Sequence, residues 1–411
     1  MNVFRDFSLQ STFMGLLIAF VGFASSFAVV LQGIRAVGAS EEQASTALMV
    51  LSISMGLSAV VLSLYTKIPV SVAWSTPGAA LLATSGVIPG GFPVAVGSFV
   101  LCAVLFIIAG LWKPLGRAVN LIPAPLANAM LAGILLGLCL APVKAISIDP
   151  LPGLAIALTW IIAGRINRLL AVPAALLALI LIMAYSLDIT DESKELLFSN
   201  VVAPFTLVTP EFTLSGFVGI ALPLFIVTMA SQNVPGIAIL RVHNYEPKAG
   251  TLFSATGIFS VFSAFFGGHA VNLAAITAAM CASEDAHPDK DRRYWAAIVS
   301  GIGYILFGLV SGLITTFASI APGILIESVA GLALIGAFSN SALSAFSDPD
   351  KREASAVTFV VTASGVTFFG VSGAFWGILA GGLILLITRL FEPKNVPPLP
   401  INKPGSNING S

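Results

Sequence analysis

The segment from Ile68 to Trp112 contains no Asp, Glu, Lys or Arg, and this run constrains the fold more than any other feature of the sequence. A membrane-spanning helix needs about 20 apolar residues, so a run of this length holds two membrane segments. Similar runs follow along the chain, which is 57% hydrophobic and 9% charged, whereas soluble domains carry about 25% charged residues. The sequence therefore predicts an all-α polytopic membrane protein.

The charge balance and the cysteines argue against several classes of protein. The 19 basic residues cancel the 19 acidic ones, so nothing favours a nucleic-acid partner. Cys102, Cys139 and Cys281 lie in apolar runs without a CxxC spacing, which argues against disulfides and metal sites. Without a zinc, phosphate-loop or nucleophile motif, we expect neither an enzyme nor a cofactor. The first apolar run follows Arg5 and Asp6 without a small-residue cleavage site, so we expect a retained helix.

The apolar runs divide into fourteen predicted membrane segments, two of them short. Basic residues test this count, because cytoplasmic loops are enriched in Lys and Arg. With both termini in the cytoplasm, 16 basic residues fall on the cytoplasmic side and 3 on the outer side, namely Arg35, Lys144 and Lys194. Removing one segment would invert every later loop and destroy this bias. The predicted segments cover residues 13–35, 43–65, 69–84, 93–111, 123–141, 150–164, 169–187, 214–240, 249–266, 270–283, 294–319, 322–346, 354–370 and 372–390.

The two halves of the chain resemble each other. Ile-Pro-Ala-Pro at 122–125 and Ile-Ala-Pro-Gly at 320–323 each begin a helix, and the small and polar residues at 22–26 match those at 229–233 by position. Each half holds seven segments, an odd number, so the second half enters the membrane from the opposite side. The sequence therefore predicts a 7+7 inverted repeat, a usual frame for alternating access.

The third segment is interrupted in its middle by residues that do not suit a continuous membrane helix. Ser75 or Thr76 is expected to cap a half-helix, with Pro77 at its first position. The free N–H groups at Ala79 and Ala80 would then bring the positive end of the helix dipole to the protein centre. Backbone left unpaired at membrane depth is costly, so such a break is buried in protein or lines a cavity.

The tenth segment has a matching interruption. Gly267 and Gly268 allow a backbone bend, and Asn272 is expected to cap the second half-helix. Two opposed helix N-termini suit an anion. The alternative is that Pro and Gly only kink two ordinary helices.

Trp74 directly precedes the first half-helix, in the middle of a span. Most membrane tryptophans lie at the bilayer interface, so a tryptophan at this depth needs another reason. It either stacks on a flat aromatic substrate or fills a gap between helices.

The eighth segment carries a polar cluster at Thr228, Ser231, Gln232 and Asn233, followed by Pro235-Gly236. The hydroxyl and amide groups can donate hydrogen bonds to a carboxylate. Polar residues also hold membrane helices together, and this second interpretation stays open. Ser25 and Gln32 in the first segment are the weaker counterparts.

His269 and Glu327 are the two ionisable residues that lie deep in predicted spans. Such groups are functional by default. His269 adjoins the predicted site and can titrate near neutral pH, although a neutral histidine bonded to a helix-end carbonyl is the alternative. Glu327 is a proton carrier, a subunit contact or a side chain that reaches the interface. The sequence does not choose between the two residues for proton coupling.

Three motifs together resemble those of the bacterial benzoate:proton symporter (BenE) family. They are Pro-Val-Ser-Val-Ala-Trp-Ser-Thr-Pro-Gly at 69–78, Ala-Ser-Gln-Asn-Val-Pro-Gly at 230–236 and Phe-Gly-Gly-His-Ala-Val-Asn at 266–272. The resemblance covers nearly the whole chain, to Arg389. The family is similar in architecture to nucleobase–ascorbate and sulfate-permease-like carriers.

The resemblance implies a division into two domains, often in a homodimer. A core domain would comprise residues 1–112 and 191–320, and a gate domain residues 113–190 and 321–391, followed by a disordered cytoplasmic tail at 392–411. It also implies a short strand before the half-helix in segments 3 and 10. Nucleobase symporters have acidic residues in segments 8 and 10, whereas Gln232 and the surroundings of Ile276 are uncharged here. The absence of carboxylates suits an anionic substrate.

We therefore expect a proton-coupled carrier in the inner membrane that takes up benzoate or a similar aromatic carboxylate by an elevator-like motion. The alternatives are a carrier of another small anion or a nucleobase, an anion channel, or a scaffold. The expected coupling residues are His269 and Glu327. The expected substrate-binding residues are Trp74, Ser75, Thr76, Ser231, Gln232, Asn233, Gly268, His269, Asn272, Gln32 and Ser25.

Overall fold

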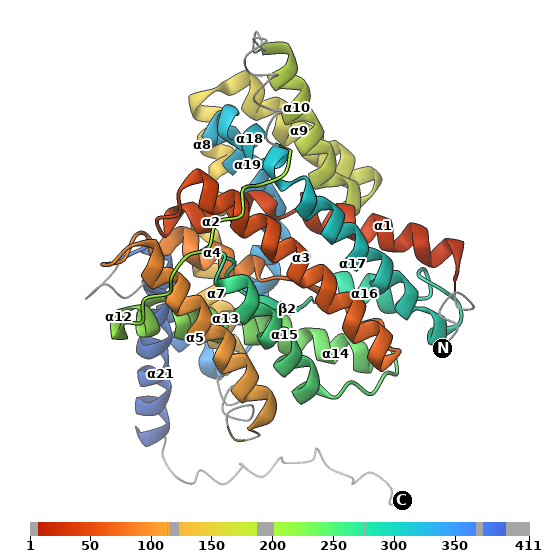
Figure 1. Cartoon of the computed structure of the whole chain (residues 1–411). Helices are drawn as coiled ribbons and strands as arrows, with labels where there is room; N and C mark the ends of the chain where they lie inside the picture. Colours follow the sequence, from red (N-terminus) through yellow and green to blue (C-terminus); the bar gives the residue numbers. More distant parts are fainter. Residues whose placement is uncertain are drawn as a thin grey trace, which may run out of the picture.

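The computed structural model of the chain describes residues 7–112, 114, 123–186, 201–274, 276–366 and 373–391. Helices make up most of these residues, and their one sheet is a pair of three-residue strands (Figure 1). The three cysteines are all unpaired. The predicted tail at 392–411 lies outside the described residues.

Among the described residues, the main helices and the strand of the first half of the chain lie close to the predicted segments. The first two helices are separated only by Ser25 and Ser26. The elements are α1 (Leu9–Ala24), α2 (Phe27–Ala36), α3 (Glu41–Thr66), β1 (Val72–Trp74), α4 (Thr76–Ser85), α5 (Phe92–Leu111), α7 (Ala124–Cys139), α8 (Ala141–Ile148), α9 (Pro150–Ile166) and α10 (Ala171–Ser186).

The second half begins with one long helix that contains two π-helical turns. Its parts are α12 (Leu214–Gly216), the π turn η3 (Phe217–Ala221), α13 (Leu222–Thr228), the π turn η4 (Met229–Asn233) and α14 (Val234–Val242). The elements that follow are α15 (Ala249–Ala264), β2 (Val271–Leu273), α16 (Ile276–Ala282), α17 (Tyr294–Leu309), α18 (Ser311–Ile320), α19 (Gly323–Phe346), α20 (Arg352–Ala363) and α21 (Gly373–Phe391).

Among the described residues, seven helices are long and apolar enough to cross a membrane. A bent pair, α17 and α18, makes an eighth span if the two are counted as one, with 56° between them. Shorter apolar helices lie at 150–166, 249–264 and 373–388. The chain is therefore a helical protein with many apolar spans.

Both interrupted segments consist of a strand followed by a short helix. β1 pairs antiparallel with β2, with Val72 opposite Leu273 and Trp74 opposite Val271. Two further hydrogen bonds extend the pair, from the Ser75 N–H to the Ala270 carbonyl and from the Ala274 N–H to the Ser71 carbonyl, both 3.0 Å. Because the strands are antiparallel, α4 and α16 leave the pair at opposite ends.

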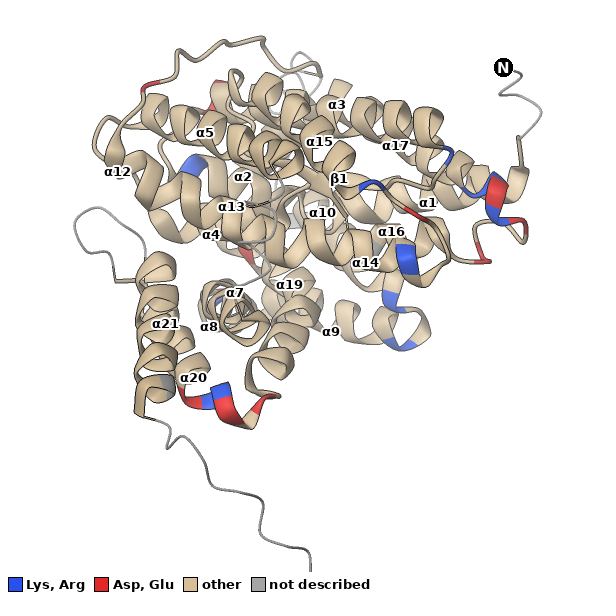
Figure 2. Ribbon diagram, turned by 90° about the horizontal axis from the view of Figure 1, so that it is seen from below, with Lys and Arg blue, Asp and Glu red and all other residues tan. Residues whose placement is uncertain are grey.

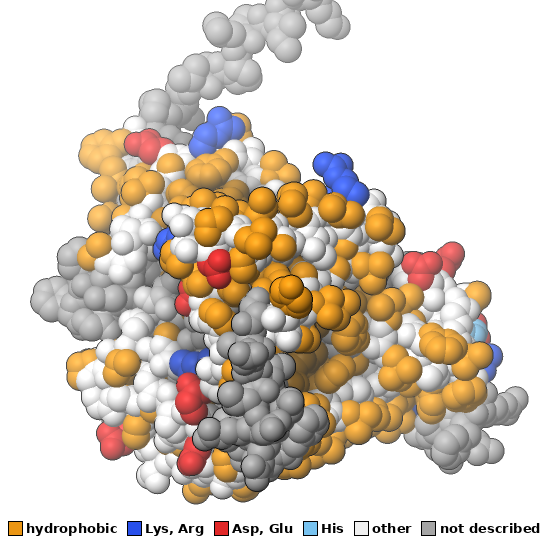
Figure 3. All heavy atoms as spheres, turned by 90° about the horizontal axis from the view of Figure 1, so that it is seen from above, with side chains coloured by type: hydrophobic (Ala, Val, Ile, Leu, Met, Phe, Trp, Pro, Cys, Tyr) orange, Lys and Arg blue, Asp and Glu red, His pale blue; other side chains and the backbone are white. Residues whose placement is uncertain are grey.

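The interior is built from two main apolar clusters. The larger one runs through α2, α3, α4, α5 and the strand pair. A separate one joins α8, α9, α10 and α19, at the top of Figure 1, through Ala145, Ile156, Leu179 and Leu325. In Figure 2 the charged residues lie mostly at helix ends and connections, and in Figure 3 hydrophobic side chains cover much of the outer face. An apolar exterior is expected for a protein whose solvent is lipid.

Candidate functional site

A cavity of about 110 Å³ lies where the first, third, eighth and tenth segments are interrupted. We call it the polar cavity. Four of the sequence-predicted residues line it, namely Ser25, Trp74, Thr76 and Gln232, and none of its lining residues is charged. Binding sites for drug-sized ligands measure about 300–1,000 Å³, so this one suits a small molecule. Its lining residues are Val21, Gly22, Ser25, Ser26, Met55, Ala73, Trp74, Thr76, Gln232, Ala274, Thr277, Met280 and Tyr304.

The half-helix α4 begins at this cavity. Ser75 is its N-cap, and the Ser75 hydroxyl accepts a hydrogen bond from the Gly78 N–H at 3.0 Å. The same hydroxyl pairs with the Thr228 hydroxyl at 2.7 Å, which ties α4 to the eighth segment. Pro77 occupies the second helical position, one residue later than predicted.

The expectation that the Ala79 and Ala80 N–H groups face the site is wrong. The Ala79 N–H donates to the Ser75 carbonyl at 2.8 Å, because the helix begins at Thr76 and these two residues lie inside its first turns. The group at the end of the dipole is Thr76, whose N–H has no intrahelical acceptor. Thr76 lines the polar cavity and can present both its N–H and its hydroxyl to an anion.

Trp74 lines the polar cavity and also packs between helices. Its Nε1–H donates to the Ser26 hydroxyl at 2.8 Å, and its ring lies 5.2 Å from the Phe23 ring, tilted by 59°. The structure bears out the packing interpretation of Trp74, and its place at the cavity leaves stacking on a substrate as a prediction. The indole is held by the break in the first segment, with part of its surface facing the cavity.

Asn272 is not a helix cap. It lies inside β2, opposite Ala73, and α16 begins only at Ile276. The strand pairing keeps Asn272 extended, and its side-chain amide donates to the Leu273 carbonyl at 2.8 Å. Its Oδ1 is buried without a hydrogen-bond partner among the described residues. Asn272 does not line the polar cavity.

Residues 267–269 lie just before β2 and pack against its surroundings without reaching the polar cavity. Gly267 has φ +84°, the left-handed conformation that favours glycine. A Cβ on Gly268 would lie 1.9 Å from the Ser263 hydroxyl, so a side chain cannot fit there. His269 is fully buried, and its Nε2–H donates to the Ser75 carbonyl at 3.0 Å, while Nδ1 has no partner among the described residues. Neither Gly268 nor His269 lines the polar cavity.

The polar cluster of the eighth segment lies on a π turn. π turns interrupt the regular hydrogen bonding of a helix and are frequent at functional sites. Here the turn directs Gln232 to the polar cavity. The neighbouring Ser231 hydroxyl donates to the Val227 carbonyl at 2.6 Å and does not line the cavity. Asn233 is buried and accepts a hydrogen bond from the Leu273 N–H at 2.9 Å, so it supports β2.

Three polar residues at the cavity were not singled out as binding residues from the sequence: Ser26, Thr277 and Tyr304. Tyr304 is a buried tyrosine in the middle of an apolar segment, and that depth is the signal that marks it, because membrane tyrosines favour the interfaces. Gly22 leaves space for the Tyr304 side chain, since a Cβ on residue 22 would lie 2.2 Å from the Tyr304 hydroxyl oxygen. The Thr277 hydroxyl pairs with the Ser71 hydroxyl at 2.7 Å.

A second cavity, of about 430 Å³, contains the remaining predicted residues. Gln32 and Arg35 of α2 line it together with Glu327 of α19. Gln32 Oε1 is buried without a partner among the described residues, and Glu327 is half-buried. Arg35 also forms an ion pair of 2.5 Å with Glu41. The structure thus separates Gln32 and Glu327 from the polar cavity.

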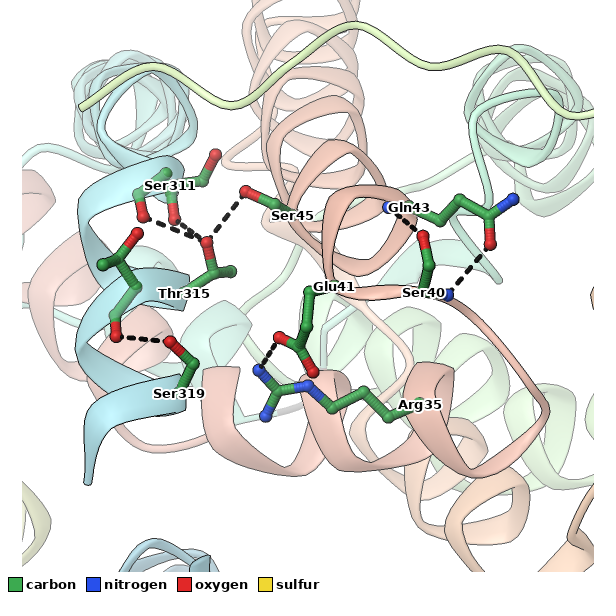
Figure 4. A network of polar contacts seen from close by, with 10 residues as sticks. Arg35, Ser40, Glu41, Gln43, Ser45, Ser311, Thr315 and Ser319 are labelled. Carbon is green, nitrogen blue, oxygen red and sulfur yellow. Dashed lines mark hydrogen bonds and ion pairs between the residues drawn. The ribbon is translucent and has the colours of Figure 1, made fainter. Parts of the chain in front are cut away.

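Figure 4 shows a network of polar contacts around Arg35, one of the residues that line this second cavity. Next to the Arg35–Glu41 pair, Ser40 and Gln43 form a capping box that begins α3. One turn later, the Ser45 hydroxyl meets the Thr315 hydroxyl of α18 at 2.8 Å. These contacts join the end of α2 to the start of α3, and α3 to the middle of α18.

Comparison with known proteins identifies the family. The model of the family described as benzoate membrane transport protein matches residues 5–387. The chain belongs to this family. It is 32% identical over 391 residues to the benzoate membrane transport protein of Acinetobacter baylyi, covering 95% of this chain and 97% of that protein. It is 38% identical over 381 residues to the inner membrane protein YdcO of Escherichia coli, covering 93% and 96%. The family's members are membrane transporters and not enzymes.

Solved structures of two transporters share the fold. The transmembrane domain of the cyanobacterial bicarbonate transporter BicA superposes with a TM-score of 0.56 at 15% identity, covering 94% of this chain and 98% of that one. The murine anion transporter Slc26a9 in its inward-facing state gives a TM-score of 0.60 at 12% identity, covering 94% of this chain and 69% of that one. At these identities the likeness is one of fold.

Proposed function

We propose that this member of the benzoate membrane transport family is a secondary active transporter that takes up benzoate or a similar aromatic carboxylate together with a proton. The observation that carries the proposal is the polar cavity, which combines an indole ring with uncharged hydrogen-bond donors and contains no acidic side chain. A carboxylate needs donors and is repelled by other carboxylates. An aromatic ring needs a flat apolar partner.

Each group at the cavity then has a role in binding. Thr76 offers its N–H and hydroxyl at the positive end of the ten-residue helix α4, where the helix dipole favours an anion. Gln232 offers a side-chain amide from the π turn, and Trp74 holds the ring. Ser75, Asn233 and Asn272 support these groups through hydrogen bonds to Thr228, Leu273 N–H and Leu273 carbonyl, respectively.

We further infer an architecture of fourteen membrane segments in a 7+7 inverted repeat, placed in the inner membrane with both termini in the cytoplasm. The helix bounds, the two strand–helix segments and the matched irregular turns at 25–26 and 229–233 support it. The core domain would comprise residues 1–112 and 191–320, and the gate domain residues 113–190 and 321–391. The separate apolar cluster of α8, α9, α10 and α19 supports a gate that moves as a unit, in an elevator-like motion within a homodimer.

The proton has two candidate carriers, His269 and Glu327. His269 is fully buried behind α4, so its charge would be felt by the bound anion through the Ser75 carbonyl. Glu327 lines a cavity between α2 and α19, which a core–gate motion would open and close. Glu327→Gln and His269→Gln separate the two, because only the variant of the true carrier loses the pH dependence of transport.

Benzoate binding to the purified protein tests the proposal. Calorimetry at about pH 5.5 and about pH 7.5, two values on either side of the ordinary pKa of a histidine side chain, should show saturable binding that changes with pH. Gln232→Ala should weaken binding about tenfold or more, since a hydrogen bond to a charged group is lost. Gln10→Ala, which removes an amide bonded to the Asp285 carbonyl outside the cavity, is the matched control.

Counterflow in liposomes distinguishes a carrier from the alternatives. A carrier accelerates the uptake of labelled benzoate when unlabelled benzoate is inside, a channel does not, and a scaffold moves nothing. Binding of uracil or of an inorganic anion in place of benzoate would retain the fold and overturn the substrate.

A further inference from the structure

A third cavity, entirely apolar, lies on the other side of α1 from the polar cavity. It measures about 360 Å³ and has no polar lining surface. We call it the phenylalanine cavity, because five of its lining residues are phenylalanines. The lining residues are Phe20, Phe23, Ala24, Phe27, Leu176, Ile180, Phe307, Leu313, Ile314 and Phe317.

The helical repeat explains why the two cavities are neighbours. Residues 21, 22, 25 and 26 line the polar cavity, while residues 20, 23, 24 and 27 line the phenylalanine cavity. Residues three and four apart share a face of a helix, so the end of α1 and the start of α2 present small and hydroxyl groups on one side and phenylalanines on the other. Only the thickness of this helix and its side chains divides the two spaces.

Phe23 is the side chain that stands at this division. Its ring lies 5.2 Å from the ring of Trp74, which lines the polar cavity. It lies 4.8 Å from the ring of Phe307, which lines the phenylalanine cavity, in a stacked arrangement with 27° between the planes. Phe23 is buried and continues the stack to Phe27 at 5.8 Å. A row of rings therefore runs from one cavity to the other through Phe23.

The contacts around Phe23 hold it in place. The Trp74 Nε1–H is bonded to the Ser26 hydroxyl, and that hydroxyl donates to the Gly22 carbonyl at 3.0 Å. The Ser26 N–H also donates to the Phe23 carbonyl at 3.2 Å. The indole and the backbone that carries Phe23 are thus tied to the same break in the first segment. These hydrogen bonds fix the positions of Trp74 and Phe23 in the absence of substrate.

We propose that Phe23 determines the size of the aromatic group that this transporter accepts. With Phe23 in place, the polar cavity of about 110 Å³ is closed towards the larger apolar space and takes a carboxylate with a single ring. Phe23 does not line the polar cavity itself but packs directly behind Trp74, which does. Shortening Phe23 removes the ring between Trp74 and Phe307, so the indole can move aside and the second ring of a fused-ring carboxylate lies among Phe27, Phe307 and Phe317. This inference rests on the proposed function and names the feature that limits its substrates.

The test compares the binding of benzoate and 2-naphthoate to the purified full-length protein. The wild type should prefer benzoate, and Phe23→Ala should shift the ratio of the two affinities towards 2-naphthoate by about tenfold or more, the effect of adding or removing small apolar volume in a pocket. Phe23→Leu should shift it in the same direction by less. The milder variant keeps the test valid if Phe23→Ala does not fold.

Phe20→Ala is the matched control. Phe20 lines the phenylalanine cavity one turn earlier on α1, and the structure gives its ring no contact with Trp74. Its removal leaves Phe23 between the cavities, so the ratio should stay that of the wild type.

Two results would overturn the proposal. If folded Phe23→Ala and Phe23→Leu keep the wild-type ratio of the affinities for benzoate and 2-naphthoate, Phe23 does not limit the size of the substrate. The same result would follow if a lipid acyl chain fills the phenylalanine cavity. If the wild type binds no benzoate at all, the proposed function fails, and this inference with it. The first result leaves the proposed function intact, so the two failures are distinguishable.

Discussion

The two strand–helix segments have the same design but different tasks. β1 and α4 bring Trp74 and Thr76 to the polar cavity, and α4 is a ten-residue helix capped by Ser75. β2 contains Asn272 and follows His269, and neither side chain lines the cavity; both are buried and bonded to backbone carbonyls. From the described part of the tenth segment, Ala274, Thr277 and Met280 reach the cavity.

This difference shows that a repeated motif need not repeat its chemistry. The third segment supplies the groups that would bind the substrate, and the tenth supplies the groups that hold the third in position. His269 links the two directly, since its ring bonds the carbonyl of the residue that caps α4. Three experiments would sharpen or break this division into a binding half and a supporting half.

The largest effect is expected for His269→Ala. The substitution removes a buried ring and leaves the Ser75 carbonyl without one of its donors, so the free energy of unfolding should fall by about 3 kcal/mol. A thermal melt should show a clear drop in the midpoint, partly restored in His269→Gln, which keeps a donor. His287→Ala, in the connection between α16 and α17, is the control. A stable His269→Ala protein that has lost only benzoate binding would place His269 in the binding half.

The second experiment compares Thr76→Val with Thr277→Val, and its expected effect is smaller. Both hydroxyls line the polar cavity, but the Thr277 hydroxyl already pairs with the Ser71 hydroxyl. Thr76→Val should therefore weaken benzoate binding about tenfold. Thr277→Val should change affinity little and lower the melting temperature instead, because it removes the hydroxyl that pairs with the buried Ser71 hydroxyl. Equal losses of affinity in the two variants would show that both segments bind the substrate.

The smallest effect is expected for Ser75→Ala. It removes the cap of α4 and the partner of the Thr228 hydroxyl, so the free energy of unfolding should fall by about 1 kcal/mol, with a modest loss of affinity from the displaced Thr76. Ser75→Thr keeps a hydroxyl and should behave nearly as the wild type in a chemical denaturation series. An affinity loss as large as that of Thr76→Val would mean that Ser75 itself contacts the substrate.

The sequence by itself determined the class of protein, the position of most helices and the segments that line the candidate site. Charge-free runs such as Ile68–Trp112 must form membrane segments, because lipid does not solvate charges or unpaired backbone. Pro77 and the Gly267-Gly268 pair indicated where two of these segments break, since each residue acts on its own backbone. The motifs around these breaks were sufficient to indicate the family.

The tertiary structure alone decided which of the polar residues at the breaks face the cavity. Asn272 was expected to cap a helix, but its pairing with Ala73, some two hundred residues away, keeps it in a strand. Ser231 and Gln232 are adjacent in sequence, and only the π turn gives the second of them access to the cavity. Tyr304 contacts Gly22, and Phe23 contacts Trp74 and Phe307, each a neighbour from another helix or strand. Such contacts depend on packing between distant segments, and local backbone preferences do not encode them.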